Sequence, residues 1–310
     1  MKQEWRKEGR IFDPADHSFG WLASHAAVPT ADLIRGDRYR VWYSGRDRES
    51  RSHMSYLEID INEPTNLLYV HPEPVLSPGA AGRFDDSGVM ASSIVDDGGR
   101  KYLYYAGWNR TVTVPFRNAM GVAVSDDHGK TYRKCFDGPI LDRTTVDPIF
   151  VGAGYALQDK DCWRMWYLSC LRWDLSGKSP RHYYHLRYAS SEDGIHWNRD
   201  GAVSIDFKNE SEYAISRPSV IFEDGVYRMW YSYRGESYRI GYAESSDGIH
   251  FDRMDDQVGL DVSRDGWDSE MIEYAHVIDH GGKKHMFYNG NRFGESGIGY
   301  AALDEQPQQP

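Results

Sequence analysis

One repeated unit constrains the fold of this chain more than any other feature. Its clearest copy begins at residue 217, where two short apolar runs flank a tight turn at 223–225. The second run ends in the aromatic pair Trp230-Tyr231, and a third run at 239–244 leads into a Ser-Asp-Gly turn and Phe251. Self-similarity at a fixed period is typical of repeat architectures, so it is interpreted before any local motif.

The aromatic pair marks five copies of the unit. The pairs are Trp42-Tyr43, Tyr104-Tyr105, Trp166-Tyr167, Trp230-Tyr231 and Phe287-Tyr288, so the second members are separated by 62, 62, 64 and 57 residues. Alternating apolar and polar positions between Gly and Asp turns predict strands rather than helices. The aromatic residue after the turn (Tyr132, Trp197 or Phe251) is expected to start an outer strand and to fill the space between neighbouring units.

Five four-stranded units that close into a ring predict an all-β fold, a five-bladed β-propeller, with residues 1–310 in a single domain. The expected blades span roughly 21–75, 84–138, 144–200, 212–255 and 267–303. The last copy contains only three strands, so the N-terminal segment 5–12 is expected to supply the fourth strand and close the last blade. A β-sandwich with coincidental spacing is the alternative.

Composition excludes several classes of function. A net charge of −11 argues against nucleic acid as a partner, because phosphate binding needs a basic surface. No long apolar run predicts a membrane span, and no export signal is visible at the start of the chain. The three cysteines fit neither a disulfide framework nor a zinc spacing. We therefore expect a cytoplasmic protein with no metal and no cofactor.

The starts of the first strands are the first place to look for chemistry, because the innermost strands of a propeller line its central channel. Carboxylates occur at four of the five starts, and the remaining start carries His25. The carboxylates singled out are Asp86, Asp147, Glu212, Glu270 and Glu273. The aromatic pairs place Glu273 opposite Ser216, Tyr274 opposite Arg217 and His276 opposite Ser219.

Glu273 and His276 need an explanation, because charged groups on an inner strand are costly unless they are paired or solvated. One reading is a buried polar network in which Glu273, Arg217 and His276 hold the blades together. The other reading is that these side chains line a ligand cavity in the axial channel.

The loops after the second strands are rich in arginine and aromatic residues. The residues concerned are Arg46, Trp108, Arg110, Arg172, Trp173, Arg234 and Arg292. These arginines could pair with acidic residues of the adjacent blade. They could also form a concave rim in which guanidinium groups bind an anion or sugar hydroxyls, with Trp108 and Trp173 as stacking faces.

The repeat count, the phrase Tyr-Arg-Met-Trp-Tyr-Ser at 227–232 and the run from Ile240 to Phe251 resemble the five-bladed furanosidase-type glycosidases and the mannoside phosphorylases. The resemblance covers nearly the whole chain. In the hydrolases of this group, three successive inner strands carry an Asp base or nucleophile, an Asp followed by Pro, and a Glu acid. This sequence departs from that pattern, because His25 stands in the first blade and Asp147-Pro148 in the third.

The resemblance implies an intracellular carbohydrate-active enzyme that cleaves or transfers a glycosyl group in the axial pocket. Such cleavage needs one protonated carboxyl at the leaving oxygen and one ionised carboxylate. Glu273 or Asp86 is the expected acid and Asp147 the base, while Arg217 and His276 orient a carbohydrate or sugar phosphate. The arginine-rich rim favours a phosphate-containing ligand. The alternatives are a non-catalytic sugar-binding or scaffolding propeller, and a lyase or cyclase that uses His25 or His276 as base.

Overall fold

The computed structural model describes residues 2–159, 162–177 and 179–304. Its strands form five groups of four, each a run of antiparallel neighbours. Group 1 contains β2 (Ser24–Arg35), β3 (Arg38–Arg46), β4 (Ser52–Asp60) and β5 (Leu67–Val70). Group 2 contains β6 (Gly88–Asp97), β7 (Arg100–Arg110), β8 (Phe116–Ser125) and β9 (Arg133–Lys134). Group 3 contains β10 (Val151–Asp159), β11 (Cys162–Asp174), β12 (Arg181–Ser191) and β13 (Val203–Ile205).

The last two groups complete the fold. Group 4 contains β14 (Ala214–Glu223), β15 (Val226–Arg234), β16 (Tyr238–Ser245) and β17 (Asp252–Arg253). Group 5 contains β18 (Glu273–His280), β19 (Lys283–Asn289), β20 (Ile298–Leu303) and β1 (Trp5–Phe12). The helices are the single turns η1 (Pro14–Asp16), η2 (Asp255–Gln257) and α1 (Asn291–Gly294). The all-β prediction is therefore confirmed for the described residues.

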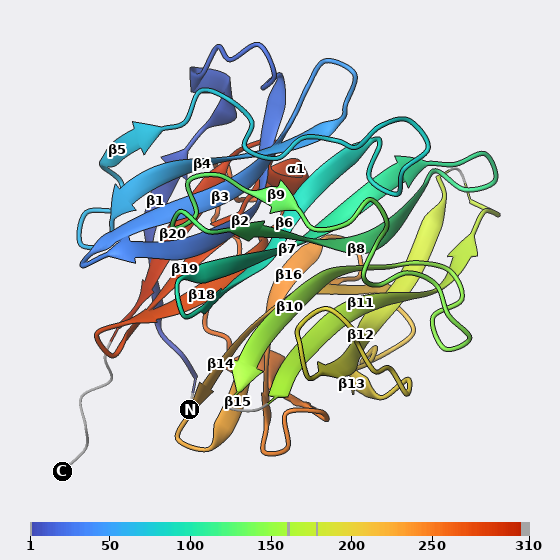
Figure 1. Ribbon diagram of the computed structural model, residues 1–310. Helices are drawn as coiled ribbons and strands as arrows, with labels where there is room; N and C mark the ends of the chain where they lie inside the picture. Colours follow the sequence, from blue (N-terminus) through green and yellow to red (C-terminus); the bar gives the residue numbers. More distant parts are fainter. Residues whose placement is uncertain (1, 160–161, 178, 305–310) are drawn as a thin grey trace.

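The N-terminal strand pairs as predicted. Antiparallel pairing of β1 with β20 runs from Trp5 opposite Leu303 to Phe12 opposite Ile298. Figure 1 shows the blue β1 beside the red β20, so the two ends of the chain share one sheet. The third group extends beyond its expected boundary at residue 200, because the turn that carries Trp197 precedes β13.

The first strands of the five groups contact one another in chain order. β2 contacts β6, β6 contacts β10, β10 contacts β14 and β14 contacts β18, and β18 returns to contact β2. Backbone strand pairing between groups is sparse in the described chain, where Ser52 with Gly88 and Tyr184 with Ala214 form the parallel pairs. Side chains therefore hold the groups together.

Aromatic residues fill the space between groups as the repeat predicts. The rings of Tyr132 and Trp42 lie 5.3 Å apart at the junction of groups 1 and 2. Equivalent contacts join Trp197 to Tyr104 at 6.0 Å and Phe251 to Trp166 at 6.1 Å. Each Trp or Tyr reached in this way is fully buried. Burial of such large rings is the main favourable contribution to packing between the groups.

Each first strand has a β-bulge beside the aromatic pair of the second strand. The bulge leaves backbone N–H groups free to bond to side chains of the neighbouring strand group. The register shifts include those between Ser216 and Ser219 in β14 and between Glu273 and His276 in β18. Arg217 and Tyr274 adopt left-handed φ angles of 54° and 57° at these bulges. Side chains of adjacent groups accept the freed N–H groups, as Ser232 Oγ does from Tyr274 at 2.7 Å. Bulges of this kind re-aim side chains next to functional sites.

Asn289 connects group 5 to group 1 at their line of contact, which we call a seam. Its Oδ1 accepts from the Val28 N–H at 2.8 Å, and its Nδ2 donates to the Ala26 and Gly297 carbonyls at 2.7 and 2.8 Å. The side chain is completely buried. One residue therefore satisfies three backbone groups where the last group meets the first.

Candidate active site

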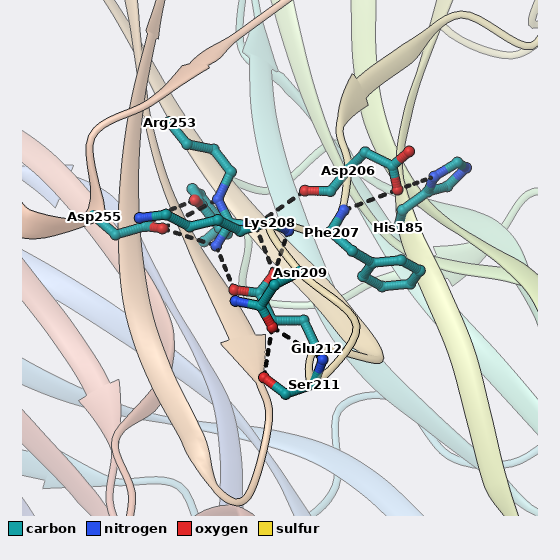
Figure 2. Close-up of polar contacts among 10 residues, drawn as sticks. His185, Asp206, Phe207, Lys208, Asn209, Ser211, Glu212, Arg253 and Asp255 are labelled. Atoms are coloured by element: carbon teal, nitrogen blue, oxygen red, sulfur yellow. Dashed lines mark hydrogen bonds and ion pairs between the residues drawn. The ribbon is translucent and has the colours of Figure 1, made fainter.

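The carboxylates at the strand starts belong to a repeated structural cluster. The second tyrosine of an aromatic pair donates its hydroxyl to Asp85 (Tyr105, 3.4 Å), Asp147 (Tyr167, 3.0 Å) or Asp268 (Tyr288, 3.0 Å). A cation from an outer strand or a neighbouring segment completes each cluster, as Lys7 does with Asp268 at 2.7 Å. Figure 2 shows the form in group 4, where Arg253 bridges Glu212 at 2.7 Å and Asp255 at 2.8 Å.

Asp147 is saturated by such partners. It is fully buried, accepts from Ser169 at 2.6 Å and pairs with Arg187 at 3.2 Å and Arg199 at 2.9 Å. Asp86 binds its own loop, through the Gly82 N–H and the Ser87 hydroxyl, both at 2.9 Å. These contacts favour structural roles. Catalysis by Asp86 or Asp147 stays a prediction that the function proposed below does not use.

Replacing Asp147 by Asn distinguishes a structural role of this carboxylate from a catalytic one. Loss of the charge leaves Arg187 and Arg199 without their shared carboxylate, so we expect the free energy of unfolding to fall by about 2–4 kcal/mol. Chemical denaturation measures this change. We expect the folded fraction to keep its specific activity. A stable variant that has lost all turnover would instead establish Asp147 as catalytic.

Arg217 and His276 fill the interior between the first strands. The Arg217 guanidinium donates to the Ser92 carbonyl, to the Pro29 carbonyl at 3.0 Å and to the Thr30 hydroxyl at 2.6 Å. His276 Nε2 lies 3.3 Å from the Ala31 carbonyl oxygen, and burial lowers the pKa of His276 to about 3. Both side chains are buried, at 1% and 5% exposure. This favours the polar network for these two residues, and their contact with substrate stays a prediction outside our proposed site.

Glu273 lies elsewhere, at the end of the fold where first strands begin and second strands end. It is the first residue of β18 and is 0% exposed, and neither carboxylate oxygen has a hydrogen-bond partner of good geometry among the described residues. Burial raises the pKa of Glu273 well above its ordinary value, although the positive charge of Arg234 acts in the opposite direction. Burial of this kind favours the protonated form of a carboxyl.

Arg234 acts electrostatically on Glu273, and Arg46 acts on the adjacent Tyr274. Arg234, the last residue of β15, has no ion pair among the described residues, and its buried Nε has no hydrogen-bond partner. Its guanidinium lies over the rings of Tyr238 and Phe293, at 5.3 and 5.4 Å from their centroids. Arg46 ends β3, where it interacts electrostatically with Tyr274 and likewise forms no ion pair within the described chain. Unpaired guanidinium groups in an acidic protein are suited to bind an anion.

His25 completes the side of the site formed by group 1. Its Nδ1 lies 2.8 Å from Ser24 Oγ, and the side chain is 9% exposed. Burial, with a smaller effect of Arg46, lowers the pKa of His25 to about 4, so the imidazole is neutral at physiological pH. His25, Tyr274 and Phe293 all have left-handed φ angles, of 64°, 57° and 62°. Non-glycine residues in this region carry strain that is concentrated at functional sites.

An aromatic wall from groups 3 and 4 forms the opposite side. The Tyr184 and Tyr238 hydroxyls are hydrogen-bonded to each other, and the His182 ring stacks on Tyr184 with centroids 4.8 Å apart. Trp173 contacts His182 at 5.1 Å. Trp173 Nε1 and His182 Nδ1 are buried without a partner in the described structure. Buried polar atoms normally have partners, so these two nitrogens are candidates for contact with a ligand.

The other residues predicted to form the rim either lie outside the candidate site around Glu273 or make contacts with other parts of the chain. Trp108 donates to Ser52 Oγ at 2.7 Å, and Arg110 donates to the Glu49 carbonyl at 2.6 Å. The Arg172 guanidinium lies 3.4 Å from the centroid of the Tyr183 ring. Glu270 is exposed, and Arg292 is 3.8 Å from the Glu295 carboxylate. Their binding of substrate stays a prediction.

Sequence reasoning missed four residues of the candidate site around Glu273: His182, Tyr184, Tyr238 and Phe293. The first three lie at the starts of third strands, which were not compared between repeats. The run Arg181-His-Tyr-Tyr-His185 was a signal, because its aromatic side chains depart from the apolar pattern of the other third strands. Phe293 comes from α1, an insertion that only the fifth group contains.

The described residues contain no group of three His, Cys, Asp or Glu side chains that could hold a metal ion. Within the same residues, no helix is long and apolar enough to cross a membrane.

Comparison with known proteins identifies relatives over nearly the full length. No family model matches the chain. It is 42% identical over 300 residues to the uncharacterised protein MT1551 of Mycobacterium tuberculosis strain CDC 1551 / Oshkosh, covering 97% of this chain and 99% of that protein. The uncharacterised protein Rv1502 of strain ATCC 25618 / H37Rv matches with the same identity and coverage. The chain belongs to the family of these two proteins.

Solved structures extend this family to a wider fold. A glycoside hydrolase superimposes with a TM-score of 0.75 at 17% identity, covering 99% of this chain and 94% of that one. The α-L-arabinofuranosidase PaAbf62A of Podospora anserina, solved with cellotriose, gives a TM-score of 0.69 at 10% identity and 98% coverage of both chains. A thermostable family-43 glycoside hydrolase gives 0.63 at 15% identity, covering 93% of this chain and 91% of that one. The predicted resemblance to propeller glycosidases is therefore confirmed at the level of the fold.

Proposed function

We propose that this protein is a carbohydrate-active enzyme that cleaves or transfers a glycosyl group at Glu273. The five strand groups are the blades of a five-bladed propeller, and the site lies at one end of its axis. The closed series of contacts from β2 through β18 and back to β2 supports this arrangement. The fold shared with glycoside hydrolases supports the reaction class.

The observation that carries the proposal is the complete burial of Glu273. Glycosidic cleavage needs a protonated carboxyl at the leaving oxygen. Glu273 is fully buried, and burial raises its pKa well above the ordinary value, while Arg234, the Tyr274 side chain and the Phe293 backbone act in the opposite direction. Glu273 would therefore donate its proton to the departing oxygen as general acid.

The nucleophile in this proposal is phosphate or another anionic group rather than water activated by a second carboxylate. Arg234 acts electrostatically on Glu273 and Arg46 on the adjacent Tyr274, and neither guanidinium forms an ion pair among the described residues, although Glu295 lies within electrostatic range of Arg46. Two guanidinium groups can hold a phosphate by charge-assisted hydrogen bonds. Neutral His25 adds a hydrogen-bonding group of adjustable tautomer beside Arg46. Phosphorolysis, or transfer from a phosphate-bearing sugar, would use this set of residues.

The ionisation of Glu273 can be tested without a substrate. Its pKa is raised in the folded state, so between the unfolded value of about 4.3 and the native value only the folded protein binds the proton. The contribution of Glu273 to the free energy of unfolding is therefore complete below about pH 4.3. Above that pH the contribution falls by about 1.4 kcal/mol per pH unit, and it is lost once the pH passes the native pKa.

The measurement is denaturation of wild type and Glu273→Gln at a series of pH values. We expect wild type to lose stability relative to the variant as pH rises through this window. Difference infrared spectra of the two proteins should show a protonated carboxyl that persists above pH 5. A constant stability difference, with a carboxyl that titrates near 4.3, would exclude Glu273 as a neutral acid.

A further inference from the structure

A second pocket lies at the same end of the molecule as Glu273. It has a volume of about 330 Å³ and is formed by the loop before β2 and the turn between β3 and β4. Its lining residues are Gly20, Trp21, Asp47, Arg48, Glu49, Arg51 and His53. Small-molecule sites have volumes of about 300–1,000 Å³ and combine aromatic surface with a few oriented polar groups. The pocket has the size and composition for a single sugar unit.

Trp21 provides a rigid aromatic platform in this pocket. Its Nε1 donates to the Pro72 carbonyl at 2.8 Å. The indole stacks with Phe19 at an interplanar angle of 2° and with Tyr43 at 25°. A Cβ at Gly45 would collide with the indole, so the glycine makes room for it. The half-buried ring is held before any ligand arrives, which reduces the entropic cost of binding.

The polar groups around Trp21 are also positioned. Asp47 Oδ2 accepts from Arg51 Nε at 2.9 Å and lies 3.1 Å from His53 Nε2. Arg48 is exposed and forms neither a hydrogen bond nor an ion pair in the described part of the chain. The pocket thus offers a free donor beside fixed carboxylates, with acidic and basic side chains in balance. Such a mixture suits the hydroxyl groups of a neutral sugar better than a phosphate.

The pocket adjoins the site around Glu273. Arg46, which interacts electrostatically with Tyr274 next to Glu273 in the chain, is followed directly by Asp47 and Arg48 of the pocket. Trp21 packs on Gly45 immediately before Arg46. Ser24, the neighbour of His25, pairs with Arg46 in the register of β2 and β3. The Trp21 pocket and the site around Glu273 therefore both lie at the end of β3.

We propose that the Trp21 pocket binds a second, neutral glycosyl unit of the substrate, with its apolar face on the indole and its hydroxyls on Arg48 and Asp47. This inference rests on the proposed function, since it gives that site a preference for substrates of two or more sugar units. Arg48 and Trp21 would determine chain-length specificity and take no part in bond cleavage.

The test measures binding separately from turnover. The probes are neutral gluco-, manno-, xylo-, arabino- and fructo-oligosaccharides of one to four units, titrated into the Glu273→Gln protein with saturation-transfer NMR as the readout. We expect a disaccharide or longer probe to bind at least about tenfold more tightly than its monosaccharide, which corresponds to about 1.4 kcal/mol. Adding Arg48→Ala should remove most of this gain and leave monosaccharide binding unchanged.

Two further variants make the result specific. Arg35→Ala removes an exposed arginine at the opposite end of β2 and should change nothing. Trp21→Phe keeps an aromatic ring for stacking on Phe19 and should weaken only the longer probes. Equal affinity for all chain lengths, or equal behaviour of the Arg48 and Arg35 variants, would overturn the second subsite while the proposed function stands. Chain-length-dependent binding by a protein that turns over no glycoside would instead refute the proposed function.

Discussion

Replacing Glu273 by Gln is expected to lower kcat/KM for glycosyl cleavage by about 10²–10⁴-fold, the contribution typical of a general acid. Gln has the shape of a neutral Glu but cannot release a proton. Because burial favours the uncharged form of Glu273 and Gln is uncharged, the substitution should leave the fold and its stability at low pH unchanged. Steady-state kinetics on any substrate that wild type turns over give the ratio.

The choice of leaving group sharpens this experiment. An aryl glycoside with an acidic phenol needs little protonation, so its turnover should fall least, while an alkyl glycoside or oligosaccharide should lose the full factor. Circular dichroism and thermal unfolding verify that the variant is folded. Equal loss with all leaving groups would show that Glu273 does not act as the acid. Full retention of activity would place the chemistry elsewhere.

Replacing Asn289 by Ala is expected to destabilise the protein more than any other single change at a seam between groups. The variant leaves the Val28 N–H and the Ala26 and Gly297 carbonyls buried without partners. Each unsatisfied buried group costs about 1–3 kcal/mol, so we expect a loss of at least about 3–5 kcal/mol. Equilibrium denaturation in urea measures it.

The control is a side chain at another seam that makes a single hydrogen bond. Among the described residues, Ser44 Oγ accepts one hydrogen bond, from the Ala91 N–H at 3.3 Å, between groups 1 and 2. Ser44→Ala should therefore cost about 1 kcal/mol. Similar losses for the two variants would contradict the special role of Asn289 where the last group meets the first. A lower denaturant dependence in Asn289→Ala would further indicate that this seam opens before the rest of the fold.

The sequence repeat predicted most of the fold because it acts through local chemistry. The aromatic pairs identify the second strands, and the turn residues place Tyr132, Trp197 and Phe251 between neighbouring groups. The N-terminal strand could be predicted by counting, since the last unit lacked a strand. The exact boundaries of the repeated units were harder to predict, because β13 follows a turn whose length differs between copies.

The candidate site was less predictable because its contacts are not local. A carboxylate at a strand start looks the same in sequence whether it is catalytic or structural. For Asp147 the difference lies in Arg199, which is 52 residues away. For Asp268 it lies in Lys7, at the other end of the chain. Glu273 was identified because it stood on the strand itself, where no partner could be foreseen from the repeat.

The aromatic surroundings of Glu273 were missed for a related reason. Tyr184 and Tyr238 belong to third strands of different groups, and their hydroxyls meet only once the groups are assembled. Apolar periodicity treats such tyrosines as core residues. The arginines at the ends of second strands were predicted as a set, yet Arg234 alone among them acts on the buried carboxyl, while Arg46 acts on the adjacent Tyr274.

The central claim is enzymatic cleavage or transfer at Glu273, and the most direct measurement is product formation from a panel of substrates. Wild type and Glu273→Gln would be incubated with aryl glycosides, short oligosaccharides and nucleotide sugars, each with and without inorganic phosphate, and the products identified by mass spectrometry. We predict turnover by wild type that phosphate accelerates, with a sugar phosphate as product, and its loss in the variant. No turnover of any substrate, or equal turnover by both proteins, would contradict this assignment.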